Sequence, residues 1–273
     1  MPTVVQVKLL LLGIMAFSFV WFRCIESKME FSTAQFVFVL IIFCWTGFVR
    51  TGFGFGGAAL GLPFMILVAG SPIDWLPIIG LHLLFFSGLS LASALKQVDW
   101  RYFKKSLVWI LPAKIVGVIG LLNLPPNVMT VIVYSITGFY ALTWLFNYSI
   151  RSNKNWLDNV LLSLGGYISG TSLTGAPLIA AVYMRKVAKE QLRNTLFVLW
   201  FFLVSIKMGA FIAVGVHIDW QYALMLIPAA GVGHYCGLKV HAKLMENDQK
   251  FKRWLGGALL IICAIGMTKL FLG

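Results

Sequence analysis

The sequence predicts an all-α polytopic membrane protein, in which two inverted repeats each hold a glycine-broken re-entrant hairpin and three spanning helices. One extra N-terminal helix precedes the repeats. Three observations predict this fold class. The 273-residue chain is 60% hydrophobic and only 11% charged. Apolar segments recur along it at lengths that suit a bilayer, where a spanning helix needs roughly 20 apolar residues. Finally, the two halves of the chain carry the same motifs in the same order.

The charge balance excludes other classes of protein. The chain has 22 Lys and Arg residues against 9 Asp and Glu, a net charge of +13. A soluble domain carries about 25% charged residues, and a disordered chain has far fewer apolar ones. Basic loops beside membrane spans are the ordinary source of a positive surplus. We therefore expect contact with a lipid bilayer and no nucleic-acid partner.

The first apolar run, Leu9 to Phe22, has the short basic start of a signal peptide. Trp21-Phe22-Arg23-Cys24 offers no small-residue cleavage site, so we interpret residues 1–30 as a retained extra helix.

Short loops connect the later segments, which predicts a single transmembrane domain over 1–273. These segments are Thr33–Ala69 (broken near Arg50–Gly57), Trp75–Leu95, Ser106–Asn123, Val128–Ile150, Trp156–Met184 (broken near Gly165–Gly175), Thr195–Val216, Trp220–Gly237 and Trp254–Leu272.

The two broken segments share the pattern G-x3-G-x4-G-x-P, over Gly52–Pro63 and over Gly166–Pro177. Two further matches follow in order. Asp99-Trp100-Arg101-Tyr102 is echoed by Asp219-Trp220-Gln221-Tyr222, and Pro112-Ala113 with Gly117 by Pro228-Ala229 with Gly233. We interpret the chain as a duplication, with repeat 1 over 33–150 and repeat 2 over 156–273.

Basic residues predict the topology, because Lys and Arg favour cytoplasmic loops. They gather at 96–105, 151–154, 185–193 and 239–253, and are absent from the loops near 70–74, 124–127 and 217–219. Both ends of the second broken segment then face the cytoplasm, so it should enter and return on one side, while the first opens outward. The N-terminus is expected in the cytoplasm and the C-terminus in the periplasm. Inverted repeats with matching broken helices are typical of secondary transporters.

Three basic residues fall inside apolar segments, namely Arg50, Lys114 and Lys207. A basic side chain at the bilayer centre costs roughly 2.5–3.5 kcal/mol on insertion scales, and every acidic residue falls in a loop or near a segment end. An anionic ligand is the simplest source of the missing counter-charge. The alternatives are that the lysines snorkel to the membrane surface and that Arg50 only caps the first arm of its hairpin.

The glycine breaks point to the same kind of ligand, because a restarting helix directs free N–H groups at an anion. The candidate contacts are Gly52, Gly56 and Gly57 in the first break and Gly170, Thr171, Ser172 and Thr174 in the second. The alternative is that these glycines only permit close helix packing.

His82 and His234 also lie in apolar runs and are candidates for a proton relay, with ordinary packing as the alternative. No catalytic residue, metal site or cofactor is expected. The four cysteines stand singly, and Gly52-Phe53-Gly54-Phe55-Gly56 lacks the strand–turn–helix context of a dinucleotide-binding loop.

The chain resembles the sulfite exporter TauE/SafE family, also called the toluene-sulfonate uptake permease family. The resemblance lies in the two Gly-rich breaks, each followed by Pro, and in the Asp-Trp loops with the Pro-Ala…Gly helices after them. It implies an inner-membrane permease that moves sulfite, a sulfonate or a related small anion. A non-transporting membrane scaffold or assembly factor is the alternative function, and association into a homo-oligomer is left open.

Overall fold

The computed structural model describes residues 31–53, 56–91, 95–148, 154–246 and 248–272, with the side chains of 90–91 and 241–252 left aside. The described residues form helices joined by short connections, which confirms the all-α fold class. The expected extra N-terminal helix lies outside them. The helices are α2 (Thr33–Phe53), α3 (Gly57–Val68), α4 (Pro72–Leu91), the 3-10 turn η2 (Leu95–Gln97), α5 (Trp100–Asn123), α6 (Pro126–Leu145), α7 (Asn155–Ser172), α8 (Ala176–Lys186), α9 (Lys189–Val214), α10 (Trp220–Glu246) and α11 (Asp248–Leu272).

Seven of the described helices are long and apolar enough to cross a membrane, namely α2, α4, α5, α6, α9, α10 and α11. Each broken segment forms a pair of helices, α2 with α3 and α7 with α8, and α2 is also one of the seven. α3 has 12 residues and α8 has 11. At a rise of about 1.5 Å per residue such a helix covers little more than half of a hydrocarbon core of about 30 Å. The second arm of each pair is therefore a half-helix.

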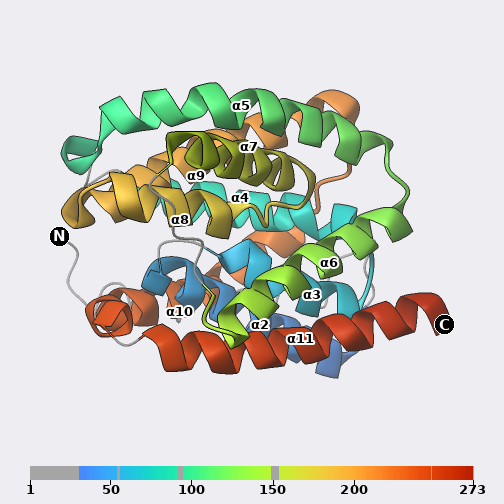
Figure 1. Ribbon diagram of the computed structural model, residues 1–273. Helices are drawn as coiled ribbons and strands as arrows, with labels where there is room; N and C mark the ends of the chain where they lie inside the picture. Colours follow the sequence, from blue (N-terminus) through green and yellow to red (C-terminus); the bar gives the residue numbers. More distant parts are fainter. Residues whose placement is uncertain (1–30, 54–55, 92–94, 149–153, 247, 273) are drawn as a thin grey trace.

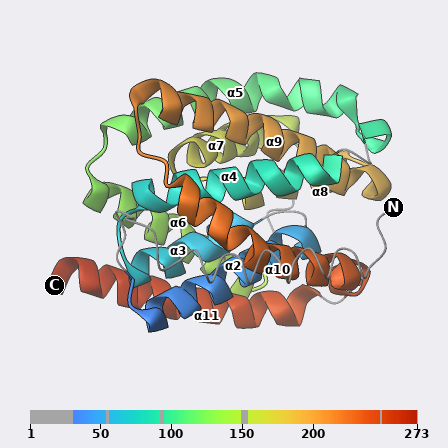
Figure 2. The ribbon, with the colours of Figure 1, turned by 180° about the vertical axis from the view of Figure 1, so that it is seen from behind.

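The helices pack in matched pairs. α2 lies along α10 and α7 lies along α5, while α4 packs on α9 and α6 packs on α11. Figures 1 and 2 show the bundle ordered from α5 and α7 at one edge, through α4 and α9, to α2, α10 and α11 at the other. The first arm of each hairpin thus packs on a helix of the other half. This pairing fits a duplicated fold; the inverted relation of the halves stays a prediction.

Glycines allow the hairpins to approach these partners. A Cβ on Gly233 of α10 would overlap the backbone of Cys44 in α2, and one on Gly170 of α7 would lie 2.9 Å from the Cα of Gly117 in α5. Close backbone approach at small residues is the usual means of packing helices in a membrane.

The repeated Asp-Trp motif has a structural cause. Asp99 accepts a hydrogen bond from the backbone N–H of Tyr102 at 2.8 Å, and Asp219 accepts one from that of Tyr222 at 3.0 Å. An Asp in this position satisfies an N–H group at the helix start that has no partner within the helix. The motif therefore marks the N-cap of the equivalent helices α5 and α10.

The buried side chains form two hydrophobic clusters, one around each hairpin. Trp75, Phe43 and Leu226 belong to the cluster around α2 and α3. Ile179 and Tyr183 belong to the cluster around α7 and α8. Each cluster also takes in the other hairpin, since Leu173 belongs to the first cluster and Phe53 and Leu60 belong to the second.

Candidate functional site

The first hairpin turns inside the bundle, between the end of α2 at Phe53 and the start of α3 at Gly57. Gly56 has a φ of 88°, in the left-handed region that residues with a Cβ rarely adopt. Gly57 lies so close to α2 that a Cβ there would stand 3.1 Å from the Cβ of Arg50. The two glycines therefore bring the start of α3 against the last turn of α2, where Arg50 stands.

Arg50 is buried, with 4% of its surface exposed. Its guanidinium carbon lies 4.4 Å from the centroid of the Phe86 ring, a cation–π contact. Its Nε and Nη2 atoms have no hydrogen-bond partner, and within the described part of the chain it forms no ion pair. Buried polar groups are nearly always hydrogen-bonded, so these two nitrogens mark a place where a ligand or water is expected.

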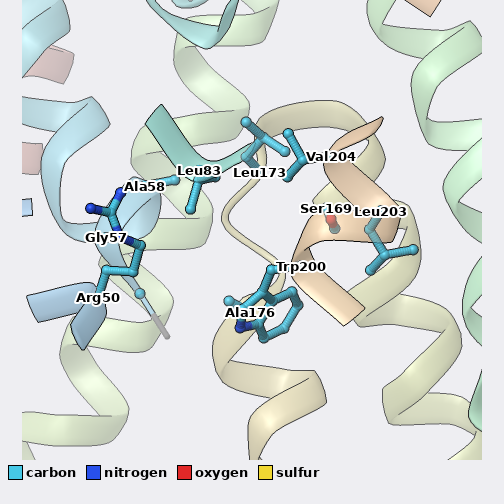
Figure 3. Close-up of a pocket in the computed structure, with 11 residues that line it drawn as sticks. Arg50, Gly57, Ala58, Leu83, Ser169, Leu173, Ala176, Trp200, Leu203 and Val204 are labelled. Carbon is cyan, nitrogen blue, oxygen red and sulfur yellow. The ribbon is translucent and has the colours of Figure 1, made fainter. Parts of the chain in front are cut away.

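A cavity of about 30 Å³ lies between the two breaks, with Arg50 in its wall. Figure 3 shows Arg50 on one side of this cavity, and Trp200 and Ala176 on the other. The first hairpin contributes Arg50, Gly56, Gly57 and Ala58, the second contributes Ser169, Leu173 and Ala176, and α4 and α9 contribute Leu83, Trp200, Leu203 and Val204. The space holds about two water molecules. We call it the central cavity.

A second cavity of about 10 Å³ shares Arg50, Gly57, Ala58 and Leu83 with the central cavity, and has Phe43, Thr46, Ile79 and His82 as its other walls. This volume suits a single water molecule. Arg50 thus borders two small cavities within the same packed region.

The second hairpin breaks between the end of α7 at Ser172 and the start of α8 at Ala176. Leu173 has a φ of 58°, a strained value for a residue with a side chain. The hydroxyls of Thr171 and Ser172 donate to Ile168 O, and the Oγ of Ser172 lies 2.5 Å from Oγ1 of Thr174. The hydroxyls expected to bind an anion are thus engaged within their own hairpin.

Lys114 of α5 and Lys207 of α9 have no exposed surface. The Nζ of Lys114 donates to Ser169 O at 3.3 Å and to Ser169 Oγ at 3.1 Å. The Nζ of Lys207 donates to Thr171 O at 3.1 Å. Both ammonium groups therefore point to the end of α7 inside the bundle rather than to the membrane surface. Neither lysine lines the central cavity.

Gly170 of α7 serves helix packing in this conformation, and Gly52 of α2 lies close to Gly237 of α10. A Cβ on Gly237 of α10 would stand 3.0 Å from the backbone N of Gly52, and one on Gly170 would strike the backbone of α5. Their expected contact with an anion stays a prediction. Gly56 and Gly57, in contrast, line the central cavity.

The two histidines flank one aromatic ring. The Phe86 centroid lies 6.3 Å from that of His82 and 5.0 Å from that of His234. His82 Nε2 lies 2.7 Å from Ala223 O while its Nδ1 has no partner, and His234 Nδ1 lies 2.6 Å from Thr51 Oγ1. Their role as a proton relay stays a prediction.

The structure adds Ser169, Phe86 and Trp200 to the residues that the sequence singles out. Ser169 falls inside the second glycine motif and could have been included with its neighbours. Phe86 and Trp200 stand in uniform apolar runs, where no pattern separates a site residue from a packing residue. In the part of the chain that the structure describes, no group of three or more His, Cys, Asp or Glu side chains could hold a metal ion.

Comparison with known families matches the chain to the sulfite exporter TauE/SafE family over residues 38–267. The match spans both breaks, the residues that line the central cavity, and the buried Arg50, Lys114 and Lys207. This family implies a multi-pass membrane transporter of sulfur-containing anions rather than an enzyme. Neither the curated proteins nor the solved structures give a match.

Proposed function

Because the chain belongs to the sulfite exporter TauE/SafE family, we propose that it is a secondary transporter for a small anion. The anion is sulfite, a sulfonate or a related sulfur-containing species. It binds at the central cavity between the two hairpins, and alternating access exposes this site to one face of the inner membrane and then to the other.

One observation carries the proposal, namely the guanidinium of Arg50. It is a buried cation without a carboxylate partner in the described chain, and its Nε and Nη2 atoms make no hydrogen bond. Burying an unpaired charge is strongly unfavourable. An anion with oxygen atoms would satisfy both the charge and the free N–H groups, and a guanidinium suits planar, two-point recognition of such groups.

Two helix starts add to the attraction. α3 begins at Gly57 and α8 at Ala176, and both residues line the central cavity, as Arg50 does. The first N–H groups of a helix have no partner within the helix, and its N-terminus carries about half a positive charge. The cavity is otherwise lined by apolar side chains such as Leu203 and Val204, where a low dielectric strengthens these interactions.

The central cavity is small in this conformation. About 30 Å³ holds roughly two water molecules, which is less than a sulfur oxyanion needs. Binding therefore requires the hairpins to separate, and rocking of one repeat against the other would achieve this. The positive charges of Lys114 and Lys207, which lie at the end of α7, add to the attraction for an anion. Direct contact between these lysines and the anion stays a prediction.

Binding of sulfite to the purified protein tests the proposal. Sulfite and methanesulfonate should raise the thermal unfolding midpoint, and liposomes holding the protein should show counterflow of labelled sulfite. Arg50→Gln should weaken binding by roughly ten- to a hundredfold, since a hydrogen bond with a charged group is worth about 1.5–3 kcal/mol. Arg101→Gln is the matched control, because Arg101 is exposed at the start of α5.

A scaffold or assembly factor would give the opposite result. Neither anion would then shift unfolding, counterflow would be absent, and Arg50→Gln would behave like Arg101→Gln. That set of outcomes would overturn the proposed function.

A further inference from the structure

The C-terminal end of α7 lies inside the bundle rather than at its surface. α7 stops at Ser172, and Ser169, Thr171, Ser172 and Thr174 around this end are all buried. The last carbonyl groups of a helix lack partners within it, and together they carry about half a negative charge. A buried helix end of this kind requires a positive or hydrogen-bond-donating partner.

Two ammonium groups supply that partner. Lys114 reaches the end of α7 from α5, in the first half of the chain, and Lys207 reaches it from α9, in the second half. Their Nζ atoms donate to the carbonyls of Ser169 and Thr171, which are two residues apart, and Lys114 also donates to the Ser169 hydroxyl. Two side chains from separate helices thus converge on one turn.

No carboxylate competes for these ammonium groups. Asp158 is a buried acid, and it pairs with Arg185 and Lys186 at the other end of its hairpin. Among the described residues neither Lys114 nor Lys207 forms an ion pair. The lysines are therefore held by oxygen atoms that carry only partial charges, which is also how proteins hold a small monovalent cation.

In secondary transporters, the C-terminal ends of broken helices and the carbonyls beside them coordinate the coupling cation. The end of α7 has the same parts, with backbone carbonyls and hydroxyls around a buried helix end. We infer that it is a monovalent-cation site which Lys114 and Lys207 fill with tethered ammonium groups, so that this protein needs no free Na⁺ to assemble its anion site.

This inference rests on the proposed function for its link to the anion, and Ser169 provides that link. Ser169 binds Lys114 through its carbonyl and hydroxyl oxygens, and it also lines the central cavity that Arg50 lines. The tethered cations therefore hold the wall of the anion site in place. A transporter that uses free Na⁺ would assemble this wall only when the ion is bound.

Sodium dependence of thermal unfolding tests the inference without any anion substrate. For the wild-type protein, exchange of choline chloride for NaCl at equal concentration should leave the unfolding midpoint unchanged. Lys207→Ala and Lys114→Ala empty one ammonium position each, and in either variant NaCl should raise the midpoint by about 2–4 °C. Lys105→Ala removes an exposed lysine from the same helix as Lys114, and should respond like the wild type.

Two results would overturn the inference. One is a sodium-dependent midpoint in the wild-type protein, which needs no variant and so does not depend on how a variant folds. The other is a folded Lys207→Ala or Lys114→Ala protein that ignores Na⁺. Because the assay contains no sulfite, its failure is distinct from failure of the anion proposal, which would appear as absent counterflow.

Discussion

The two broken hairpins share a glycine pattern but differ in what they place at the break. The first presents Arg50, with two guanidinium nitrogens free, beside a glycine in the left-handed region. The second presents carbonyls and hydroxyls, and these are already bound, to Lys114, to Lys207 and to each other. A duplicated backbone motif therefore produces the same turn of the chain while the side chains give each copy a separate task.

The open ends of the hairpins differ as well. In the second hairpin, Asp158 of α7 forms ion pairs with Arg185 and Lys186 of α8. In the first, the Nε2 of Gln35 donates to Val68 O at 3.4 Å, a long and weak hydrogen bond. The arms of the second hairpin are thus tied by ion pairs at their open end, whereas those of the first are held there mainly by packing. The first hairpin is the one that we expect to move more easily.

Membrane sidedness gives the largest contrast between the two halves. If the repeats are inverted, the caps Asp99 and Asp219 lie on opposite faces of the membrane. In a background without the native cysteines, an impermeant thiol reagent should label Asp219→Cys in intact cells. It should label Asp99→Cys only after the membrane is opened. Labelling of both positions from outside would remove the inverted-repeat model.

Leucine substitutions at Gly170 and Gly56, one in each hairpin, should distinguish a glycine needed for helix packing from a glycine needed for anion binding. A Cβ on Gly170 would strike the backbone of α5, whereas one on Gly56 has no atom nearer than 3.8 Å beyond its chain neighbours. Gly170→Leu should therefore destabilise the fold by about 3 kcal/mol or more. Gly56→Leu should lose about 1–2 kcal/mol to backbone strain, yet abolish counterflow, because Gly56 forms part of the wall of the central cavity. Unfolding of the protein in detergent measures the loss of stability, and sulfite counterflow measures the loss of transport.

Gly120→Leu provides the control, since a Cβ on Gly120 has no neighbour within 4 Å. It should leave both unfolding and counterflow close to wild type. If Gly170→Leu folded normally but failed to transport, Gly170 would belong with the anion contacts after all, and the packing interpretation would be wrong.

The sequence predicts the helices, the two breaks and the three buried cations, because these follow from composition and spacing along the chain. It does not predict where the cations point. Lys114 and Lys207 stand in apolar runs of similar sequence, which do not show where the side chains point. The packing of α5 and α9 directs both ammonium groups to the end of α7. Local sequence likewise does not show that Phe86 lies against Arg50, since that contact joins two helices.

The smallest effect concerns the open ends of the hairpins, and it tests whether the two differ in stiffness. Asp158 has 3% of its surface exposed, while its partners are partly exposed. The stabilisation that these ion pairs provide should therefore exceed that of surface pairs, which is at most about 1 kcal/mol, and fall below that of fully buried pairs. Asp158→Asn should lower the free energy of unfolding by about 2 kcal/mol. Gln35→Ala also removes the hydrogen bond from Ser32 N–H to Gln35 Oε1 at 2.9 Å, and should change the free energy of unfolding by less than about 1 kcal/mol. Hydrogen exchange should rise in α8 for the first variant and stay unchanged in α3 for the second. Equal effects at the two positions would mean that the hairpins are held alike, and the easier movement of the first would lose its support.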